Sequence, residues 1–471
     1  MKNEYYTTIG LEIHAELNTN SKMFCGCVNN PDEEMPNVNI CPVCMAHPGT
    51  LPVINKKAVE NVIKVGLALD SRIADFTEFD RKNYFYPDIP KAYQISQYKY
   101  PIVSGGSLNG VEITRIHLEE DTANNKHDRG NYSLVDFNRA GVPLMELVTE
   151  PVIHSAKEAG GFGRELQLLL RTLGVSHANM DKGEMRVELN ISISNDPNKL
   201  GTKCEVKNIN SFKAVERAAE YEIKRMSELL DAGRGDEIVQ ETRGWDEAKQ
   251  STFSQRSKEN ANDYRYFPDP DLPKLYLSKV FDIDKLRSEL PELPAQKRAR
   301  YKDDFEIKDE DVETYINDTT LGLWFEDIAK ILEDKEKVKT ASNYITSDFL
   351  GITKSNTLAK APSAQNFAEL INMTTTGEIS SRVAKDILAM IVLSDESPRK
   401  IAEEKDLIQK NDEGALKEIV QKIIDSNPGV VATYKGGKEN ALMSLVGQIM
   451  KETKGSANPA LVQKLLKGLI K

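Results

Sequence analysis

Long apolar segments are missing from this sequence of 471 residues. It has no run of about 18 apolar residues, so no transmembrane helix is predicted. Its first residues, Met-Lys-Asn-Glu-Tyr, lack the apolar core of a secretory signal. There is also no low-complexity tract and no evident internal repeat. Because 39% of the residues are hydrophobic, we expect an ordinary globular protein of two or three domains, soluble and cytoplasmic, without membrane contact.

Basic residues are fewer than acidic ones in this sequence. Against 73 Asp and Glu there are 62 Lys and Arg, which gives a formal net charge of −11. A chain of this charge repels nucleic acid as a whole, so any nucleic-acid site has to be a local basic patch. The sequence predicts such a patch after Tyr434, in a lysine-rich tail that includes Lys435, Lys438, Lys451 and Lys454. The solvated end of a helical domain would explain the same lysines.

Cysteines are few, and four of the five lie close together as Cys25-Gly-Cys27 and Cys41-Pro-Val-Cys44. Two close pairs of thiolates can converge on one tetrahedral ion, so we predict a structural zinc knuckle over residues 25–44. Disulfides are the alternative, but they require an oxidising compartment. Cys204 stands alone, and no histidine follows it in the chain, so we interpret it as a buried or edge-strand thiol and not as a nucleophile.

Residues 9–17, Ile-Gly-Leu-Glu-Ile-His-Ala-Glu-Leu, alternate between apolar and polar side chains. A period of two predicts a strand with one apolar face, and Glu12, His14 and Glu16 then form a row on the other face. Carboxylates and imidazoles in such a row can hold a divalent metal, and a metal can hold phosphates. The alternative is an ordinary solvated strand face.

Other strands with ordered polar faces are predicted at 185–193, 203–207 and 115–121. The first two read as an antiparallel hairpin, because the turn-like segment 195–201 separates them. One face of this hairpin carries the side chains of Arg186, Glu188, Asn190, Lys203, Glu205 and Lys207. Several strands with polar groups on one face predict a sheet that lines a functional site.

Helical periodicity appears at 56–69, 155–173 and 211–232, and then almost continuously after the proline-rich linker Leu290-Pro-Glu-Leu-Pro294. We therefore predict an α+β protein in three parts. The first, 1–294, is a cradle domain built on an antiparallel sheet with flanking helices. An all-α domain (295–396) and a small all-α tail domain (397–471) follow.

Several long sequence blocks together resemble the family of aspartyl/glutamyl-tRNA(Asn/Gln) amidotransferase B subunits. They are residues 9–17, 79–88, 91–97, 116–121, 136–151, 183–192, 263–271, 445–451 and 455–459. The resemblance implies a carbon–nitrogen ligase of protein biosynthesis. Such a protein uses ATP to phosphorylate the side-chain carboxylate of Glu-tRNA(Gln) or Asp-tRNA(Asn), and ammonia then displaces the phosphate.

The resemblance also implies partners and cofactors. A heterotrimer is expected, in which an amidase (the A subunit) releases ammonia from glutamine and a small protein (the C subunit) braces the other two. We find no Ser/Lys amidase pattern and no Cys/His pair in the sequence, which agrees with an external ammonia source. ATP, magnesium, structural zinc and a mischarged tRNA complete the expected set.

Residue roles follow from the resemblance and from charge. His14, Glu120 and Glu12 are the expected magnesium ligands, with Glu188 as a further catalytic carboxylate. Substrate and phosphate contacts are expected from residues of the hairpin face and one arginine beyond it: Arg186, Lys203, Glu205, Lys207 and Arg243. Lys82 and Glu120 are expected along the ammonia route, where Glu120 also accepts a proton from ammonium. Each basic residue could instead form a structural salt bridge.

A tRNA-binding scaffold without catalysis is the competing hypothesis for the whole chain. It would retain the zinc knuckle and the lysine-rich tail, with the tail touching the tRNA body by shape and not by base sequence. It predicts binding without ATP turnover. The inward-facing acids favour the enzyme, because acids repel RNA unless they hold a metal.

Overall fold

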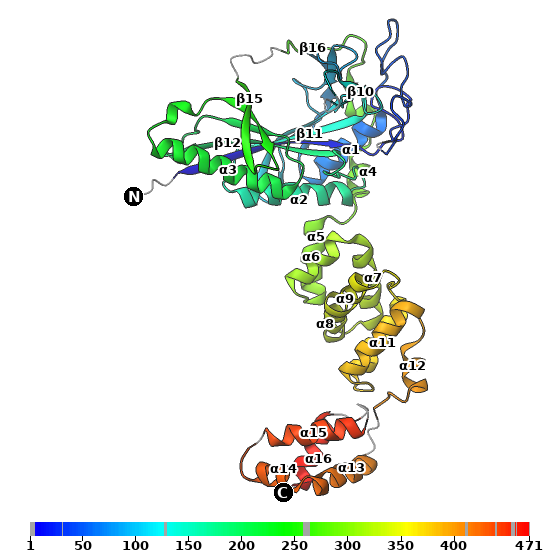
Figure 1. Ribbon diagram of the computed structural model, residues 1–471. Helices are drawn as coiled ribbons and strands as arrows, with labels where there is room; N and C mark the ends of the chain where they lie inside the picture. Colours follow the sequence, from blue (N-terminus) through cyan, green and yellow to red (C-terminus); the bar gives the residue numbers. More distant parts are fainter. Residues whose placement is uncertain are drawn as a thin grey trace. The chain divides into compact units, whose positions relative to one another are not determined.

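The computed structural model describes residues 5–30, 32–126, 130–257, 264–409, 413–438, 440–453, 457 and 459–470. Two compact units divide the chain, Met1–Pro294 and Ala295–Lys471 (Figure 1). The first unit is rich in strands and the second is helical, so the protein is mixed α/β. Among the described residues, no helix is long and apolar enough to cross a membrane.

A ten-stranded sheet organises the first unit. Its order is β15-β14-β13-β12-β1-β11-β8-β6-β2, with β7 paired to β8. The strands are β1 (Tyr6–Glu16), β2 (Arg72–Ile73), β6 (Val103–Ser104), β7 (Ser107–Leu108), β8 (Val111–Glu120), β11 (Pro143–Thr149), β12 (Met185–Ser194), β13 (Cys204–Lys207), β14 (Glu241–Asp246) and β15 (Ser251–Ser257).

The pairing confirms the predicted β12–β13 hairpin and corrects one part of the sheet prediction. Every pair in the large sheet is antiparallel except β13–β14, which is parallel. The chain runs from β13 through helix α3 (Phe212–Asp231) before it reaches β14. A helical crossover of this kind returns the chain in the same direction, which is how parallel neighbours are joined.

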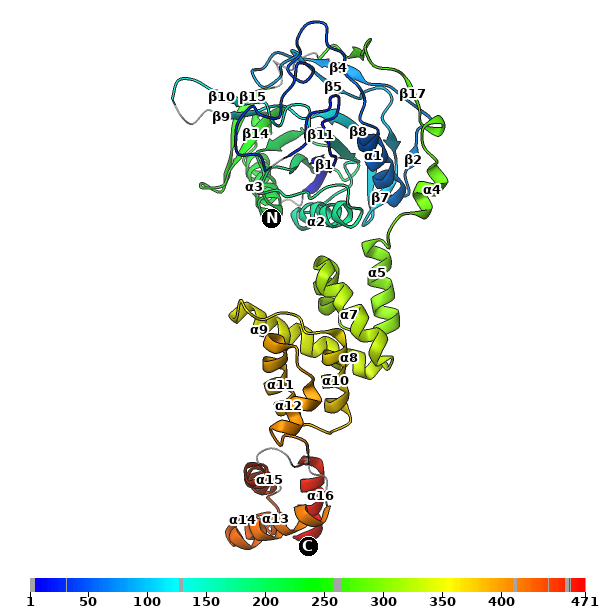
Figure 2. The same cartoon turned by 90° about the vertical axis from the view of Figure 1, so that its right-hand side faces the viewer.

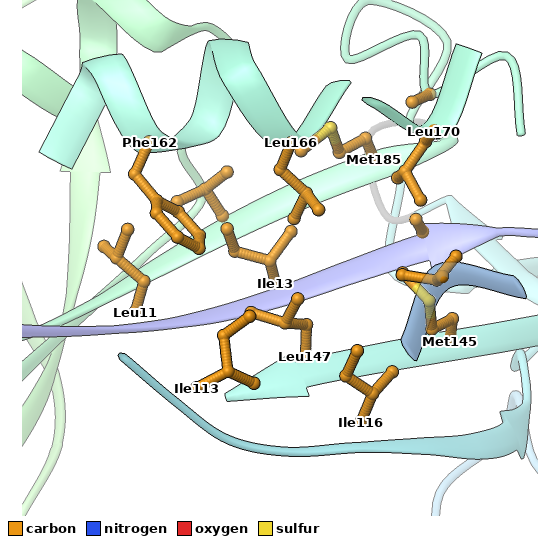
Figure 3. Close-up of a cluster of buried hydrophobic side chains, with 14 of the residues drawn as sticks. Leu11, Ile13, Ile113, Ile116, Met145, Leu147, Phe162, Leu166, Leu170 and Met185 are labelled. Carbon is orange, nitrogen blue, oxygen red and sulfur yellow. The ribbon is translucent and has the colours of Figure 1, made fainter. Parts of the chain in front are cut away.

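The apolar face of β1 is buried under helices. Ile9, Leu11 and Ile13 are at most 1% exposed, and Figure 3 shows Leu11 and Ile13 pointing toward Phe162 and Leu166. Those two residues belong to α2 (Ala156–Thr172). Helices α1 (Lys56–Ala68) and α3 add to the same core. The opposite face of β1 therefore carries Glu12, His14 and Glu16.

The three predicted helices of this unit are confirmed, and a polar side chain caps the start of each. Asn55, Ser155 and Ser211 cap α1, α2 and α3 by accepting backbone N–H groups with their side chains. Figure 2 shows these helices grouped on one side of the sheet.

Smaller pieces of sheet lie around the large one. β4 (Asp80–Asn83) pairs with β5 (Tyr93–Ser96) and with β16 (Phe267–Pro268), so segments far apart in the sequence meet. Two further pairs and short helices complete the unit: β3 (Phe76–Thr77) with β17 (Leu275–Tyr276), β9 (Asn124–Lys126) with β10 (Leu134–Asp136), the 3₁₀ turns Gly235–Glu237 and Leu277–Lys279, and α4 (Ile283–Ser288).

The second unit consists of helices. They are α5 (Pro294–Arg300), α6 (Asp309–Asn317), α7 (Thr319–Leu332), α8 (Lys335–Asn343), α9 (Leu350–Ser355), α10 (Ala364–Thr375), α11 (Ser381–Ser394), α12 (Pro398–Glu404), α13 (Glu413–Ser426), α14 (Pro428–Lys435), α15 (Ala441–Glu452) and α16 (Pro459–Leu469), with π-helical turns at Tyr301–Phe305 and Tyr344–Phe349.

Helix α12 packs against α10 and α11, although the predicted tail domain includes it. Helices α13 to α16 contribute to a hydrophobic cluster of their own, which contains Leu416, Val420, Leu445 and Leu466. The division of this unit into a middle domain and a tail domain stays a prediction.

Candidate active site

The polar face of the large sheet gathers acids and histidines from three neighbouring strands. In the register, His14 of β1 lies opposite Glu146 of β11, and Glu146 lies opposite His117 of β8. Glu12 and Glu119 are two residues away from His14 and His117, so strand alternation places them on the same face. Side chains that are widely separated in the sequence therefore form one group.

Distances within this group are short. His14 Nε2 lies 3.3 Å from Glu146 Oε2 and 3.5 Å from Glu119 Oε1, and His117 Nε2 lies 3.4 Å from Glu146 Oε2. Potential ligand atoms of Glu12, His14 and Glu146 all lie within 4.8 Å of one another, as do those of His117, Glu119 and Glu146. Oxygen and imidazole donors at such separations can share one divalent cation.

Burial and mutual charge shift the pKa values of the group. Burial works against a charged His14, yet hydrogen bonds and charge from Glu119 and Glu146 raise the pKa of His14 to about 10. Burial, with repulsion from Glu146 and Glu188, raises the pKa of Glu12 to about 7. The site concentrates negative charge, which His14 now balances as an imidazolium. A bound divalent cation would replace that charge and leave a neutral imidazole to coordinate it.

Lys82 of β4 stands over the same acids. Burial disfavours its charge, but Glu119 and Glu146 raise the pKa of this lysine above its ordinary value. The hydroxyl of Ser96 donates to Glu119 Oε2 at 3.1 Å. The charge of Lys82 and the hydrogen bond of Ser96 both come from the small sheet of β4, β5 and β16, so that sheet helps to position the acids.

Three of the predicted substrate and phosphate contacts, Arg186, Glu205 and Lys207, also lie on this face. Lys207 Nζ is 2.7 Å from Glu188 Oε2 and 3.1 Å from Glu205 Oε1. Arg186, opposite His14 in the register, lies 3.1 Å from Asp121 Oδ1. The structure therefore brings Arg186, Glu188, Glu205 and Lys207 together with His14. Lys203 precedes β13, is exposed, and forms no salt bridge within the described part of the chain.

Glu16 lies one step beyond His14 on the same face. Burial and the neighbouring Asp121 raise the pKa of Glu16 to about 8, although Arg139 and Arg186 oppose this shift. The charged groups that most affect Glu16 are thus Asp121, Arg139 and Arg186, and neither His14 nor His117 is among them.

The structure places Glu120 apart from His14. Adjacent residues of a strand point to opposite faces, and Glu119 is the one that reaches His14. Glu120 instead pairs with Lys91 Nζ at 2.7 Å and accepts the backbone N–H of Ile95 at 3.0 Å. It lines a cavity of about 340 Å³ with Cys44 and His47. Of these two acids, Glu119 is therefore the one beside His14.

Arg243, a predicted phosphate contact, also lies apart from this group. In the parallel register it lies beside the buried Val206, on the core face of the sheet. There its guanidinium contacts Glu241 Oε1 at 2.5 Å and Glu222 Oε1 at 3.3 Å. Arg243 thus closes a buried structural network next to α3. The positive charge of Arg243 alone suggested a phosphate contact. Which face of the sheet its side chain lies on could be known only from the structure.

Glu146, His117 and Glu119 were missed as site residues. The sequence could have indicated His117 and Glu119, because they are two residues apart in a predicted strand and therefore lie on the same face. Glu146 sits in Pro143–Thr149, where its neighbours are apolar. A single buried acid in such a strand was the signal for a functional position.

The four clustered cysteines converge as predicted. Cys44 Sγ lies 3.8 Å from Cys41 Sγ and 4.0 Å from Cys27 Sγ, and all four sulfurs lie within 4.8 Å of one another. Four sulfurs that are each about 2.3 Å from one tetrahedral zinc ion are about 3.8 Å apart. A hydrogen bond from Cys25, with the charge of Lys22 contributing, lowers the pKa of Cys44 to about 5. The geometry and this thiolate fit zinc.

The remaining predicted residues lie elsewhere. Cys204 is buried, and burial raises the pKa of this thiol to about 12, which confirms a buried thiol. Lys435 ends α14, Lys451 lies in α15, and both are exposed, as is Lys438. Lys454 lies outside the described residues.

Comparisons with known proteins identify related sequences over nearly the whole chain. A family model described as "GatB/GatE catalytic domain" matches residues 7–281, and one described as "GatB domain" matches residues 324–470. Similar curated proteins are named as the B subunit of an aspartyl/glutamyl-tRNA(Asn/Gln) amidotransferase. That of Persephonella marina is 43% identical and covers 99% of this chain and 100% of its own length. That of Brevibacillus brevis is 44% identical and covers 99% of both.

Proposed function

The chain belongs to the GatB family of tRNA-dependent amidotransferases, and from this membership we propose its reaction. It acts as the B subunit of an aspartyl/glutamyl-tRNA(Asn/Gln) amidotransferase, a glutamine-dependent carbon–nitrogen ligase. Its substrate is Glu-tRNA(Gln) or Asp-tRNA(Asn). Its partners are an amidase, which is the A subunit, together with a small bracing protein, which is the C subunit.

The observation that carries this proposal is the group of His14, Glu119 and Glu146 beneath Lys82. An unactivated carboxylate is a poor acyl donor, because oxide is a bad leaving group. An oxygen of the substrate carboxylate attacks the γ-phosphorus of ATP, and ADP leaves. Ammonia then attacks the acyl carbon, inorganic phosphate leaves, and the nitrogen loses one proton. Both steps need cations placed against phosphate oxygens more than they need a protein nucleophile.

His14, Glu119 and Glu146 would hold magnesium, with Glu12 beside them. When bound, the ion would neutralise charge on the phosphates. The acids hold His14 in place from two sides, and the hydroxyl of Ser96 fixes Glu119. The protein thus arranges its donors before any substrate arrives.

Lys207 and Arg186 are the proposed contacts for phosphate and carboxylate oxygens. Glu188 and Glu205 hold Lys207 from two sides, which restricts the ammonium group to the site face. Lys203 is exposed, and in this proposal its ammonium group contacts the substrate once the substrate is bound. An arginine or lysine that is already oriented loses less conformational entropy when an anion binds.

Glu120 and Lys82 keep their proposed roles on the ammonia route. Lys91 holds Glu120 on the far side of β8 from His14, so Glu120 would meet ammonium before it reaches the acyl phosphate. A carboxylate there can accept the proton that ammonium must lose, since only neutral ammonia attacks.

Outside the site, we propose that zinc staples residues 25–44 and that the lysine-rich tail contacts the tRNA body. Lys435, Lys438, Lys451 and Lys454 would supply phosphate contacts. In this proposal the helical unit comprises a middle domain and a small tail domain. The cradle domain then performs the chemistry while the tail positions the tRNA.

The test uses the reconstituted complex, ATP, ammonium chloride in place of glutamine, and each mischarged tRNA. We expect His14→Ala to reduce amidation at least about 100-fold, as removal of one metal ligand commonly does. His154→Ala is the matched control, because this histidine is exposed and outside the group. Amidated aminoacyl-tRNA is measured after deacylation.

Unchanged amidation by His14→Ala would refute the proposed metal site. Binding of tRNA by the unmodified complex, without any ATP turnover on either mischarged tRNA, would instead indicate the scaffold.

A further inference from the structure

Four tyrosine rings form a continuous row, here called the tyrosine row. Tyr84 contacts Tyr264 with ring centroids 5.8 Å apart, and Tyr264 contacts Tyr266 at 6.1 Å. Tyr266 stacks on Tyr98 at 4.5 Å with ring planes 10° apart. Tyr84 follows β4, Tyr98 follows β5, and the other two precede β16. The pairing of these three strands therefore assembles the row.

The tyrosine row is open to solvent at one end. Tyr98, the last ring at that end, is 64% exposed. By contrast, Phe79 directly before β4 is 1% exposed and belongs to the core. Aromatic rings left in water next to a site are available for a ligand with a flat apolar face.

The other end of the row reaches the candidate active site. Lys82 Nζ lies 5.0 Å from the centroid of the Tyr264 ring. The same buried ammonium group interacts with the charges of Glu119 and Glu146. One side chain thus connects the tyrosine row with the acids that surround His14.

The charges around the row suit a nucleic acid. Lys99 follows Tyr98, Arg265 separates Tyr264 from Tyr266, and both are exposed. Aromatic rings alternating with cations are the usual way in which proteins hold unpaired nucleotides, with the bases stacked and the phosphates paired.

Resting on the proposed function, we infer that the tyrosine row binds the unpaired 3′-terminal nucleotides of the mischarged tRNA. The amino acid is esterified to the terminal ribose, and an extended glutamyl group spans less than about 7 Å, the length of two extended residues. The last nucleotide must therefore bind next to the site of phosphorylation. A series of rings fits successive bases, whereas the adenine of ATP would occupy one ring.

The experiment places 2-aminopurine at the 3′-terminal position of the tRNA and titrates it with the reconstituted complex. Stacking on the row quenches its fluorescence. We expect Tyr98→Leu and Tyr266→Leu each to remove most of the quenching. Each should also raise the KM for mischarged tRNA about tenfold, which corresponds to about 1.4 kcal/mol, within the range for base–aromatic stacking. The KM for ATP stays unchanged.

Two variants serve as controls. Tyr98→Phe keeps the ring and should retain both the quenching and the KM. Tyr6→Leu removes a tyrosine of similar exposure, 46%, from the start of β1, which belongs to a different sheet from β16 and lies at the other side of the first unit (Figure 1), and should change nothing. Thermal melting verifies that each variant is folded, and Tyr98→Leu alone suffices if Tyr266→Leu is not.

Several results would overturn the inference. A raised KM for ATP would assign the row to the adenine of ATP, and loss of complex assembly would assign it to a protein partner. Unchanged quenching, or a Tyr98→Phe variant as impaired as Tyr98→Leu, would exclude stacking. The titration needs no turnover, so it remains decisive even if the unmodified complex amidates neither tRNA and the proposed function fails.

Discussion

At the scale of single residues, the face of the sheet on which a side chain lies decides its contacts more than its charge does. Glu119 and Glu120 are neighbours of the same type, yet one reaches His14 and the other Lys91. Strand periodicity predicts that they diverge, but choosing between them requires the register of β8 against β11. Arg243 illustrates the same point, because its position on the core face depends on a parallel pairing.

Asp121 yields a prediction for the pH dependence of stability. Burial alone would raise its pKa, but Arg186 and Arg139 lower the pKa of Asp121 from 3.8 to about 2. A depressed pKa stabilises the fold above the unfolded value, and this contribution is lost as the pH falls through the folded value. We expect Asp121→Asn to lower the free energy of unfolding by about 2 kcal/mol at pH 7, with the difference shrinking between about pH 4 and pH 2.

Urea unfolding followed by tryptophan fluorescence measures this difference. Trp245 lies in β14 and Trp324 in α7, so a Trp324→Phe background reports on the sheet alone. A deficit of the Asn variant that is equally large at pH 3 would contradict the ion-pair explanation.

At the scale of elements, the long ones follow from the sequence and the short ones do not. Helix α2 begins after Ser155, and β1 shows a clear period of two, because each has enough residues to display its period. β16 has two residues, and β4 and β5 have four each, which is too short to show a clear period, and β16 comes from a segment far from the other two. The three-stranded sheet that carries Lys82 therefore had to come from the structure.

Two helical glycines provide a matched test of packing. A Cβ at Gly66 of α1 would lie 2.6 Å from Val103 Cγ2 and 2.8 Å from Ile73 Cδ1, whereas one at Gly161 of α2 would meet nothing within 4 Å. We expect Gly66→Ala to lower the free energy of unfolding by about 1 to 3 kcal/mol through overpacking. Gly161→Ala should raise it by about 0.5 to 1 kcal/mol through helix propensity. Chemical denaturation of both variants measures these effects, and equal shifts would refute the packing argument.

At the scale of the whole molecule, charge is divided between functions. The net charge of −11 opposes contact with RNA, so the proposed contacts must lie in basic regions such as the lysine-rich tail. The charge distribution predicted this division directly, since it depends on composition and not on pairing.

The tail is tested by Lys435→Ala, Lys438→Ala and Lys451→Ala combined. We expect weaker tRNA binding and a salt dependence of log K that is shallower by about 2 to 3, because each lost phosphate contact removes about 0.7 to 0.9 from the slope. Lys157→Ala with Lys213→Ala, on exposed positions of α2 and α3, is the control. Filter binding over a range of salt concentrations measures the slope. An unchanged slope would remove the tail from the proposed tRNA contacts.

The central place of β1 has a consequence for synthesis on the ribosome. Ile9 pairs with Ile191 of β12, and His14 pairs with Glu146. At a translation rate of about 5 to 20 residues per second, β1 waits roughly 10 to 40 s for β12 to emerge. During that time β1 can pair only with β11, and its other edge has no sheet partner. The first strand to be made is therefore among the last to be secured, and we expect chaperone binding to nascent chains to be strongest before residue 194 has left the exit tunnel.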